Sequence, residues 1–303
     1  MSDLHDKRRY RVVHKTAYSY DAPVTTSYGR GCLRPRPQHS QSVLEHALTI
    51  DPVPQITDET RDLFGNFTHY LEIHTEHDRF EVVKESVLDV EWPLVDLDAL
   101  DVQSVAQAAA ALRQDMSLDP VEHALYTLPS AHVELSEEVR RFAETAIPAG
   151  RPLGEAIASI YHQIYNDFTY AKGATTVNST LSELLETRAG VCQDFAHLAV
   201  ACFRAAGLPS RYVSGYIETS PPPGKPKLAG SDATHAWVSV FTPAGWVDID
   251  PTNDHLADSR YIVTAWGRDF RDVSPLRGVI FTEATKSTLS VGVTVTRLDP
   301  VAP

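Results

Sequence analysis

The sequence predicts an α+β protein in which a β-rich N-terminal region precedes a core of helices packed on an antiparallel sheet. Residues 9–92 alternate between polar and apolar side chains and are broken by Pro, Gly and Asp, as short antiparallel strands are. Residues 93–206 are rich in helix formers, with apolar side chains three and four positions apart. After Gly207 the alternation with a period of two returns. Helices followed by strands place this second region in the α+β class.

The composition is that of a folded, acidic protein. A chain of 303 residues is long enough for two domains with a sizeable core. Its 27 basic and 40 acidic residues leave a net charge of −13, which argues against a nucleic acid or an anionic membrane as partner. The odd number of cysteines, three, fits no disulfide framework and favours the reducing cytoplasm. We find no apolar leader and no run of about 18 apolar residues, so we expect neither a signal peptide nor a membrane span.

The N-terminal region, residues 1–92, is expected to be a β-sandwich-like domain. Residues 10–20 and 43–50 each place aromatic, aliphatic and histidine side chains on one face by alternation. Gly65 and Asn66 lie between two such segments and predict a hairpin. Several short strands joined by turns are typical of two packed antiparallel sheets. The histidines of this region lack the spacing of metal ligands, so they are interpreted as sheet residues.

A helical linker region is expected over residues 93–150. Residues 102–114 consist mostly of helix formers, and Ser136 precedes two glutamates, as an N-cap does. The catalytic core is expected over residues 151–303. It ends in a strand at residues 287–298, where apolar and polar side chains alternate.

Three helices are expected to begin the core. Residues 153–168 carry apolar side chains at three- and four-residue steps and predict an amphipathic helix. Thr180 and Glu183 have the spacing of a capping box, and this second helix is expected to stop at Gly190. The third helix is expected to begin directly afterwards, at Cys192.

Cys192 and Cys202 occupy different places on that third helix. Cys202 falls on the apolar stripe and is interpreted as a buried thiol. Cys192 comes before the stripe, in the first turn, where free backbone N–H groups and the helix dipole favour a thiolate and are able to hold an oxyanion. From position alone, a small buried residue at a helix start fits equally well. The stripe consists of Phe195, Leu198, Ala199, Cys202 and Phe203.

A cysteine nucleophile needs a base, and His235 is the candidate. It begins a strand directly after the Pro- and Gly-rich loop 219–233, where a side chain reaches a cleft. The loop itself is interpreted either as a cleft wall or as a plain connection. His197 lies five residues after Cys192, about 500° around the helix, and is expected on the helix surface or at a domain junction.

The orienting partner of the base follows from strand register. If Phe241 pairs with Trp246, His235 and Asp250 become diagonal neighbours on one face of a hairpin, about 7–8 Å apart at the backbone. A turn one residue shorter places the two side chains on opposite faces. The alternative is a hairpin on which Asp248 and Asp250 are simply solvated. The hairpin therefore makes a Cys–His–Asp triad a testable geometric prediction.

Five segments together resemble the bacterial transglutaminase-like family, in which a β-rich N-terminal region often precedes the core. The resemblance is dense over residues 160–281. The order Cys, His, Asp also matches that of papain-like and transglutaminase-like enzymes. The segments are GVCQDFAHL at 190–198, SRYVSGY at 210–216, THAWVSVF at 234–241, GWVDIDPTN at 245–253 and GRDFRDVSPLRGV at 267–279.

The resemblance implies a papain/transglutaminase-like core and roles for individual residues. Cys192 is implied as the nucleophile, His235 as general base and acid, and Asp250 as the residue that orients His235. The backbone N–H of Cys192 is expected to be one oxyanion donor. Candidates for a second donor or for positioning the substrate are Gln193, Tyr170 and Trp237.

The implied reaction is acyl transfer from an amide or peptide bond through a thioester on Cys192. Release to water makes the protein an amidase, peptidase or deamidase, and release to an amine makes it a protein-glutamine transglutaminase. We expect hydrolysis of a peptide or protein amide substrate, without metal or cofactor. The alternative from another class is a non-catalytic binding protein on the same fold. The sequence indicates no oligomeric state.

Overall fold

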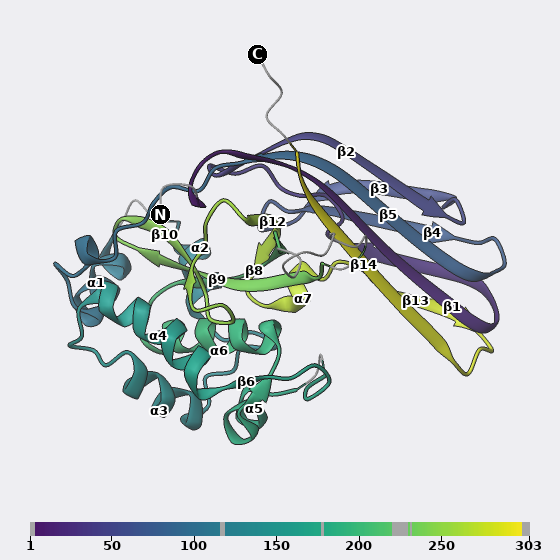
Figure 1. Ribbon diagram of the computed structural model, residues 1–303. Helices are drawn as coiled ribbons and strands as arrows, with labels where there is room; N and C mark the ends of the chain where they lie inside the picture. The colour runs from purple at the N-terminus through teal and green to yellow at the C-terminus, as the bar shows by residue number, and fades with distance from the viewer. Residues whose placement is uncertain (1–3, 116–118, 177–178, 220–229, 231, 299–303) are drawn as a thin grey trace, which may run out of the picture.

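The computed structural model describes residues 4–115, 119–176, 179–219, 230 and 232–298. Helices cover one side of a small antiparallel sheet, and a large curved sheet lies on its other side (Figure 1). This architecture confirms the predicted α+β core and the β-rich N-terminal region. No helix in the described part of the chain has both the length and the apolarity that a membrane crossing requires.

The large sheet has seven antiparallel strands organised around β1. β1 is 24 residues long; its first half pairs with β5 and β14, and its second half pairs with β4 and β13. The region is thus one curved sheet rather than two stacked ones. Its strands are β1 (Arg8–Gly31), β2 (Gln41–Asp51), β3 (Ile56–Arg61), β4 (Phe67–Ile73), β5 (His77–Val90), β13 (Arg277–Thr282) and β14 (Ser287–Leu298).

The C-terminal strand β14 lies in this large sheet, although the sequence assigned it to the catalytic core. Its alternation predicts a strand but does not say which sheet accepts it. The long β1 leaves one side free, and β14 pairs there over its whole length. Val293 and Val295 of β14 are buried against the small sheet, so strand β14 connects the two parts of the molecule.

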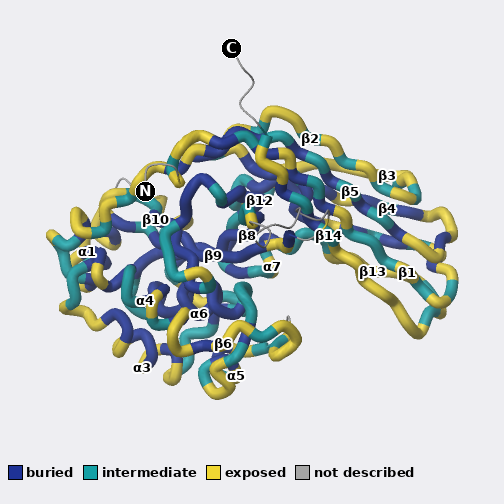
Figure 2. The backbone as a smooth tube through the Cα atoms, viewed as in Figure 1, coloured by how far each residue is buried: buried dark blue, intermediate teal, exposed yellow. Residues whose placement is uncertain are grey.

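The small sheet has the strand order β11-β10-β9-β8-β12 and forms the middle layer. One face packs on α6, and the other meets the large sheet through a cluster that includes Tyr10, Trp92 and Trp237. Figure 2 shows the buried chain concentrated along α6, β8 and β9. The strands are β8 (Ser210–Ile217), β9 (Thr234–Thr242), β10 (Gly245–Asp250), β11 (His255–Leu256) and β12 (Tyr261–Gly267).

The helices form the outer layer of the core. Side chains of α1 and α3, expected in a linker region, belong to the same apolar cluster as those of α4 and α6. The predicted caps at Ser136 and at Thr180 with Glu183 are confirmed. The helices are η2 (Asp98–Leu100), α1 (Val105–Gln114), α2 (Pro120–Thr127), α3 (Glu137–Ala146), α4 (Leu153–Asp167), α5 (Leu181–Thr187), α6 (Cys192–Ala205) and α7 (Phe270–Val273).

The segment between α5 and α6 differs from the prediction that α5 extends to Gly190. The helix ends at Thr187, because Arg188 turns the chain with a left-handed φ of 55°. Ala189–Gly190 then forms the short strand β7, which pairs in parallel with β6 (Thr169–Tyr170). A Cβ at Gly190 would lie 2.8 Å from Asp194 Oδ2, so the chain requires glycine immediately before α6.

Candidate active site

Cys192 is the first residue of α6, as its place in the sequence predicts, and it is half-buried. The N–H groups of Asp194 and Phe195 donate to the carbonyl of Val191, at 2.9 and 3.1 Å. The N–H groups of Cys192 and Gln193 precede these bonds and so have no acceptor within the helix. The first turn therefore presents two backbone donors beside the thiol.

The start of α6 is held by Asp194, whose carboxylate accepts the Val191 N–H at 2.8 Å and the Thr175 hydroxyl at 2.6 Å. A carboxylate at this position also suits the helix dipole. Because Asp194 is buried and its Oδ2 accepts both of these bonds, the direction of the first turn is set by the loop that precedes it. The backbone donors of the turn are thereby fixed relative to the small sheet.

Tyr170 lies beside this turn because β6 pairs with β7, bringing Tyr170 opposite Gly190. Its ring meets Phe195 edge-on, with centroids 6.4 Å apart, and 49% of the residue is exposed. Partial burial and the neighbouring Cys192 raise the pKa of Tyr170, so the phenol keeps its proton at neutral pH. The structure thus brings Tyr170 to the candidate nucleophile. Gln193 lies half-buried in the first turn itself.

The hairpin register predicted from the sequence is confirmed. Phe241 pairs with Trp246, and Asp248 pairs with Ser239, as β9 and β10 run antiparallel. His235 and Asp250 consequently share one face at the end of the hairpin, and His235 Nε2 lies 2.6 Å from Asp250 Oδ2. The exposed fractions are 8% for His235 and 0% for Asp250. The alternative of solvated hairpin carboxylates is therefore excluded.

Asp250 is an ionised carboxylate surrounded by donors. It accepts the Tyr261 hydroxyl at 2.5 Å, the Asn253 side-chain amide at 2.6 Å and the Thr252 N–H at 2.8 Å. Burial alone raises the pKa of this carboxyl, but His235 and the surrounding donors outweigh it and lower the pKa to about 2. Asp250 therefore presents a fixed negative charge to the imidazole.

Sequence reasoning missed Tyr261 and Asn253. Asn253 ends the segment GWVDIDPTN and follows Asp250 by three residues, so the motif contained a signal for it. Tyr261 begins β12, which enters the small sheet beside β8 rather than beside the hairpin. No local pattern in the sequence predicts its contact with Asp250.

His235 is held as an imidazolium. Burial alone lowers its pKa, but the Asp250 carboxylate, together with a hydrogen bond and electrostatic attraction from Cys192, raises the pKa to about 10. Nε2 is engaged by Asp250, so Nδ1 is the ring nitrogen left for the thiol. The structure thus brings Cys192, His235 and Asp250 together from a helix start and two adjacent strands.

Trp237 is placed inside the protein, not at the substrate side of the site. It is fully buried, contacts the rings of both His235 and Tyr261, and donates its indole N–H to Asp248 Oδ1 at 3.0 Å. Asp248 Oδ2 accepts the Ser239 hydroxyl at 3.0 Å. The only polar donor of Trp237 is therefore committed within the protein, and its ring supports His235 from behind.

His197 is buried behind the site, which corrects the expectation that it lies on the helix surface or at a domain junction. Its Nε2 accepts the Phe270 N–H at 3.1 Å, and its ring stacks on His132 and contacts Tyr212 at a tilt. Burial lowers the pKa of His197 to about 3, so the ring is neutral. It anchors α6 and offers no second base for Cys192.

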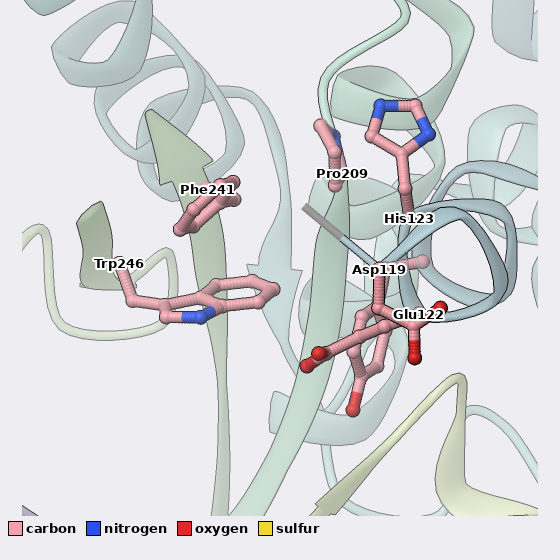
Figure 3. Close-up of a pocket in the computed structure, with 7 residues that line it drawn as sticks. Asp119, Glu122, His123, Pro209, Phe241 and Trp246 are labelled. Carbon is pink, nitrogen blue, oxygen red and sulfur yellow. The ribbon is translucent and has the colours of Figure 1, made fainter. Parts of the chain in front are cut away.

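A small cavity of about 70 Å³ lies at the other end of the hairpin (Figure 3). Phe241 and Trp246 form one wall, and Glu122 and His123 of α2 face them. Because Phe241 and Trp246 flank the turn, this cavity is separated from His235 by the length of β9. It is not part of the candidate active site. The loop 219–233, interpreted as a possible cleft wall, lies largely outside the described residues.

Comparisons with known proteins identify two family regions in the chain. Residues 10–89 match the bacterial transglutaminase-like N-terminal region, and residues 140–251 match the transglutaminase-like superfamily. An uncharacterized protein of Mycobacterium tuberculosis is 43% identical over 301 residues, which cover 96% of this chain and 94% of the relative. A protein-glutamine gamma-glutamyltransferase of Pseudomonas aeruginosa is 30% identical over 185 residues, 52% of this chain and 28% of that one.

A solved structure matches nearly the whole chain. It is a candidate cysteine protease from Cytophaga hutchinsonii, with a TM-score of 0.76, 19% sequence identity, and coverage of 98% of this chain and 93% of that one. At this identity the match establishes the fold. Fold and sequence matches together define a papain-like member of a cysteine-dependent enzyme family. The chain belongs to the transglutaminase-like superfamily and carries its bacterial N-terminal region.

Proposed function

We propose that the protein is a cysteine-dependent amidase or peptidase that cleaves an amide bond through a thioester on Cys192. The observation that carries the proposal is the bond between His235 Nε2 and Asp250 Oδ2, 2.6 Å long, which holds the imidazolium beside the thiol of a helix-start cysteine. Nucleophile, base and orienting carboxylate are the three parts such a reaction requires.

The first half of the reaction forms the acyl-enzyme. The thiolate of Cys192 attacks the carbonyl carbon, and the oxygen becomes an oxyanion that the N–H groups of Cys192 and Gln193 are able to hold. As the carbon–nitrogen bond breaks, His235 gives its proton to the leaving nitrogen, and ammonia or an amine departs. Asp250 stays ionised throughout, because its pKa of about 2 lies far below neutral pH.

The second half releases the product. His235 is now neutral, so it removes a proton from water while the water oxygen attacks the thioester carbon. The carbon–sulfur bond breaks, a carboxylic acid leaves, and the thiolate–imidazolium pair is restored. Neither half requires a metal or a cofactor.

Water is the proposed acceptor. Cys192 is only half-buried and Tyr170 beside it is about half exposed, so solvent reaches the thioester. The second candidate is transfer to an amine, which is favoured by the resemblance to the Pseudomonas aeruginosa protein-glutamine gamma-glutamyltransferase. Hydrolysis and transfer to an amine share the first half-reaction and differ only in the nucleophile that attacks the thioester.

The substrate is proposed to be a peptide or protein amide, and the compartment the cytoplasm. All three cysteines, Cys32, Cys192 and Cys202, are free thiols, which suits a reducing environment. A non-catalytic binding protein would have no need to bury an imidazolium against an ionised carboxylate, because such pairs are costly to desolvate.

Mass spectrometry of reactions with a peptide library tests the function. Wild-type protein and Cys192→Ala are compared, each with and without an added primary amine. Loss of ammonia with gain of water indicates deamidation, cleavage products indicate a peptidase, and amine adducts indicate transglutamination. Product formation that persists in Cys192→Ala, or no product in any reaction, would contradict the proposal.

A further inference from the structure

A second, larger cavity lies where the large sheet meets the segment 267–279. This segment was singled out in the sequence, yet the catalytic geometry makes no use of it. The cavity has a volume of about 350 Å³, within the usual range of a small-ligand site. Its charged lining consists of four arginines and two aspartates: Arg30, Arg268, Arg271, Arg277, Asp62 and Asp272.

The two carboxylates of the cavity are already engaged. Asp272 accepts two hydrogen bonds from the guanidinium of Arg268, at 2.8 and 2.9 Å. Asp62 accepts the N–H groups of Phe64 and Asn66, at 2.9 and 2.8 Å, and thereby shapes its own turn. Arg268 is consequently neutralised by its partner, and the other three arginines are not.

Arg30 and Arg277 stand directly opposite each other on β1 and β13. Like charges at such a position destabilise a sheet, because the two Cα atoms are only about 4.5–5.5 Å apart. Among the described residues, the ion pairs formed by arginine do not include Arg30, Arg271 or Arg277. Arg277 donates a hydrogen bond to the Arg271 carbonyl at 3.2 Å, which leaves its charge uncompensated. In a chain with a net charge of −13, three guanidiniums around one cavity that lack a carboxylate partner in the described part of the chain are a distinctive arrangement.

We propose that this cavity binds a compact polyanion, a small molecule with two or more adjacent phosphate or carboxylate groups. Guanidinium groups pair with such oxygens in a bidentate manner, and a ligand between Arg30 and Arg277 relieves their mutual repulsion. Arg271 adds a third cation from α7. The ligand would join β1 and β13 of the large sheet to the segment that follows β12, and so would stabilise the contact between the two parts of the molecule.

The proposal is tested by thermal unfolding and calorimetry of the full chain with inorganic pyrophosphate, with citrate and with sodium chloride at equal ionic strength. The variants are Arg30→Gln and Arg277→Gln. The matched control is Arg113→Gln, which changes an exposed arginine in the last turn of α1. Protection of the buried Cys202 from iodoacetamide checks that each variant retains its fold.

A saturable rise in the melting temperature of about 3 °C or more is expected with one of the two polyanions and not with chloride. Pyrophosphate assigns a phosphate ligand, and citrate assigns a carboxylate ligand. Arg30→Gln and Arg277→Gln should weaken binding at least about tenfold, while Arg113→Gln should bind as the wild type does. No saturable response of the wild type, or equal responses of all variants, would overturn the proposal.

The same variants make a second prediction without any anion. Arg30→Gln removes one of two opposed charges, so its melting temperature in chloride buffer should equal or exceed that of the wild type. A clear decrease would mean that the arginine already has a stabilising partner within the protein, and would count against an anion site.

Discussion

His235 Nε2 and Asp250 Oδ2 lie 2.6 Å apart, although the residues are 15 positions apart in the chain. The register of the β9–β10 hairpin places them there, because Phe241 opposite Trp246 puts both side chains on one face. Tyr261, reaching over from β12, completes the set of donors around the carboxylate. The proposed chemistry depends on this pair more than on any other contact.

Replacement of Asp250 should disable His235 without moving it far. In Asp250→Asn the carboxylate that raises the pKa of His235 to about 10 is lost, so this pKa should fall. Turnover of a responsive peptide should drop about 10³- to 10⁴-fold, and the basic limb of the pH–rate profile should move to lower pH. The profile is measured by initial rates from about pH 5 to about pH 11. An unshifted basic limb would show that Asp250 does not control His235.

Stability should depend on pH through the same two residues. The pKa of His235 is raised from 6.5 to about 10, so its contribution is complete below pH 6.5 and is lost as the pH rises through 10. The pKa of Asp250 is lowered from 3.8 to about 2, so its contribution is present above pH 3.8 and is lost as the pH falls through 2. Urea unfolding of the wild type and of His235→Asn at a series of pH values measures how these two contributions to the free energy of unfolding change with pH. The variant should lose the decline between pH 6.5 and 10, and an unchanged decline would refute the assignment.

Tyr261→Phe isolates one hydrogen bond to Asp250. The ring contacts with His235 and Trp237 remain, so the fold should be retained. A lost hydrogen bond to a charged group costs about 1.5–3 kcal/mol, which predicts about a tenfold or greater loss of turnover. Tyr18→Phe, on the large sheet, is the control and should leave turnover unchanged. Equal turnover in the two variants would show that the hydrogen bond from Tyr261 to Asp250 does not contribute to the reaction.

Trp237→Phe distinguishes support of His235 from contact with substrate. The change leaves buried Asp248 with one donor fewer, and the free energy of unfolding should fall by about 1–3 kcal/mol. KM for a responsive peptide should stay within about twofold, because the indole does not face the substrate. A raised KM with an unchanged free energy of unfolding would show that Trp237 positions the substrate, as the sequence suggested.

The sequence predicts what depends on local spacing. The first turn at Cys192, the capping box at Thr180 and Glu183, and the hairpin register follow from periodicity and turn length, and all are present. The contact of Tyr261 with Asp250 depends on the order of strands in the sheet, which no local pattern encodes.

Two further features also lie beyond local patterns. The pairing of β14 with β1 depends on which edge is free once the other strands are placed. The helix α5 ends earlier than the predicted Gly190, because Arg188 adopts the left-handed conformation two residues before this glycine. The first feature is decided by a contact between distant segments, and the second by the backbone conformation of a single residue.

The central claim is that His235 activates Cys192, and the rate of alkylation by iodoacetamide tests it most directly. Cys32 and Cys202 are buried, so selective labelling of Cys192 in the wild type reports only that this thiol is exposed. The rate of Cys192 labelling is therefore compared between the wild type and His235→Gln at each pH. An isolated thiol reacts about 100-fold faster at pH 8 than at pH 6, following its thiolate fraction. We predict that wild-type Cys192 reacts at pH 6 at least about tenfold faster than in His235→Gln. Equal rates in the two proteins, rising together with pH, would contradict the account.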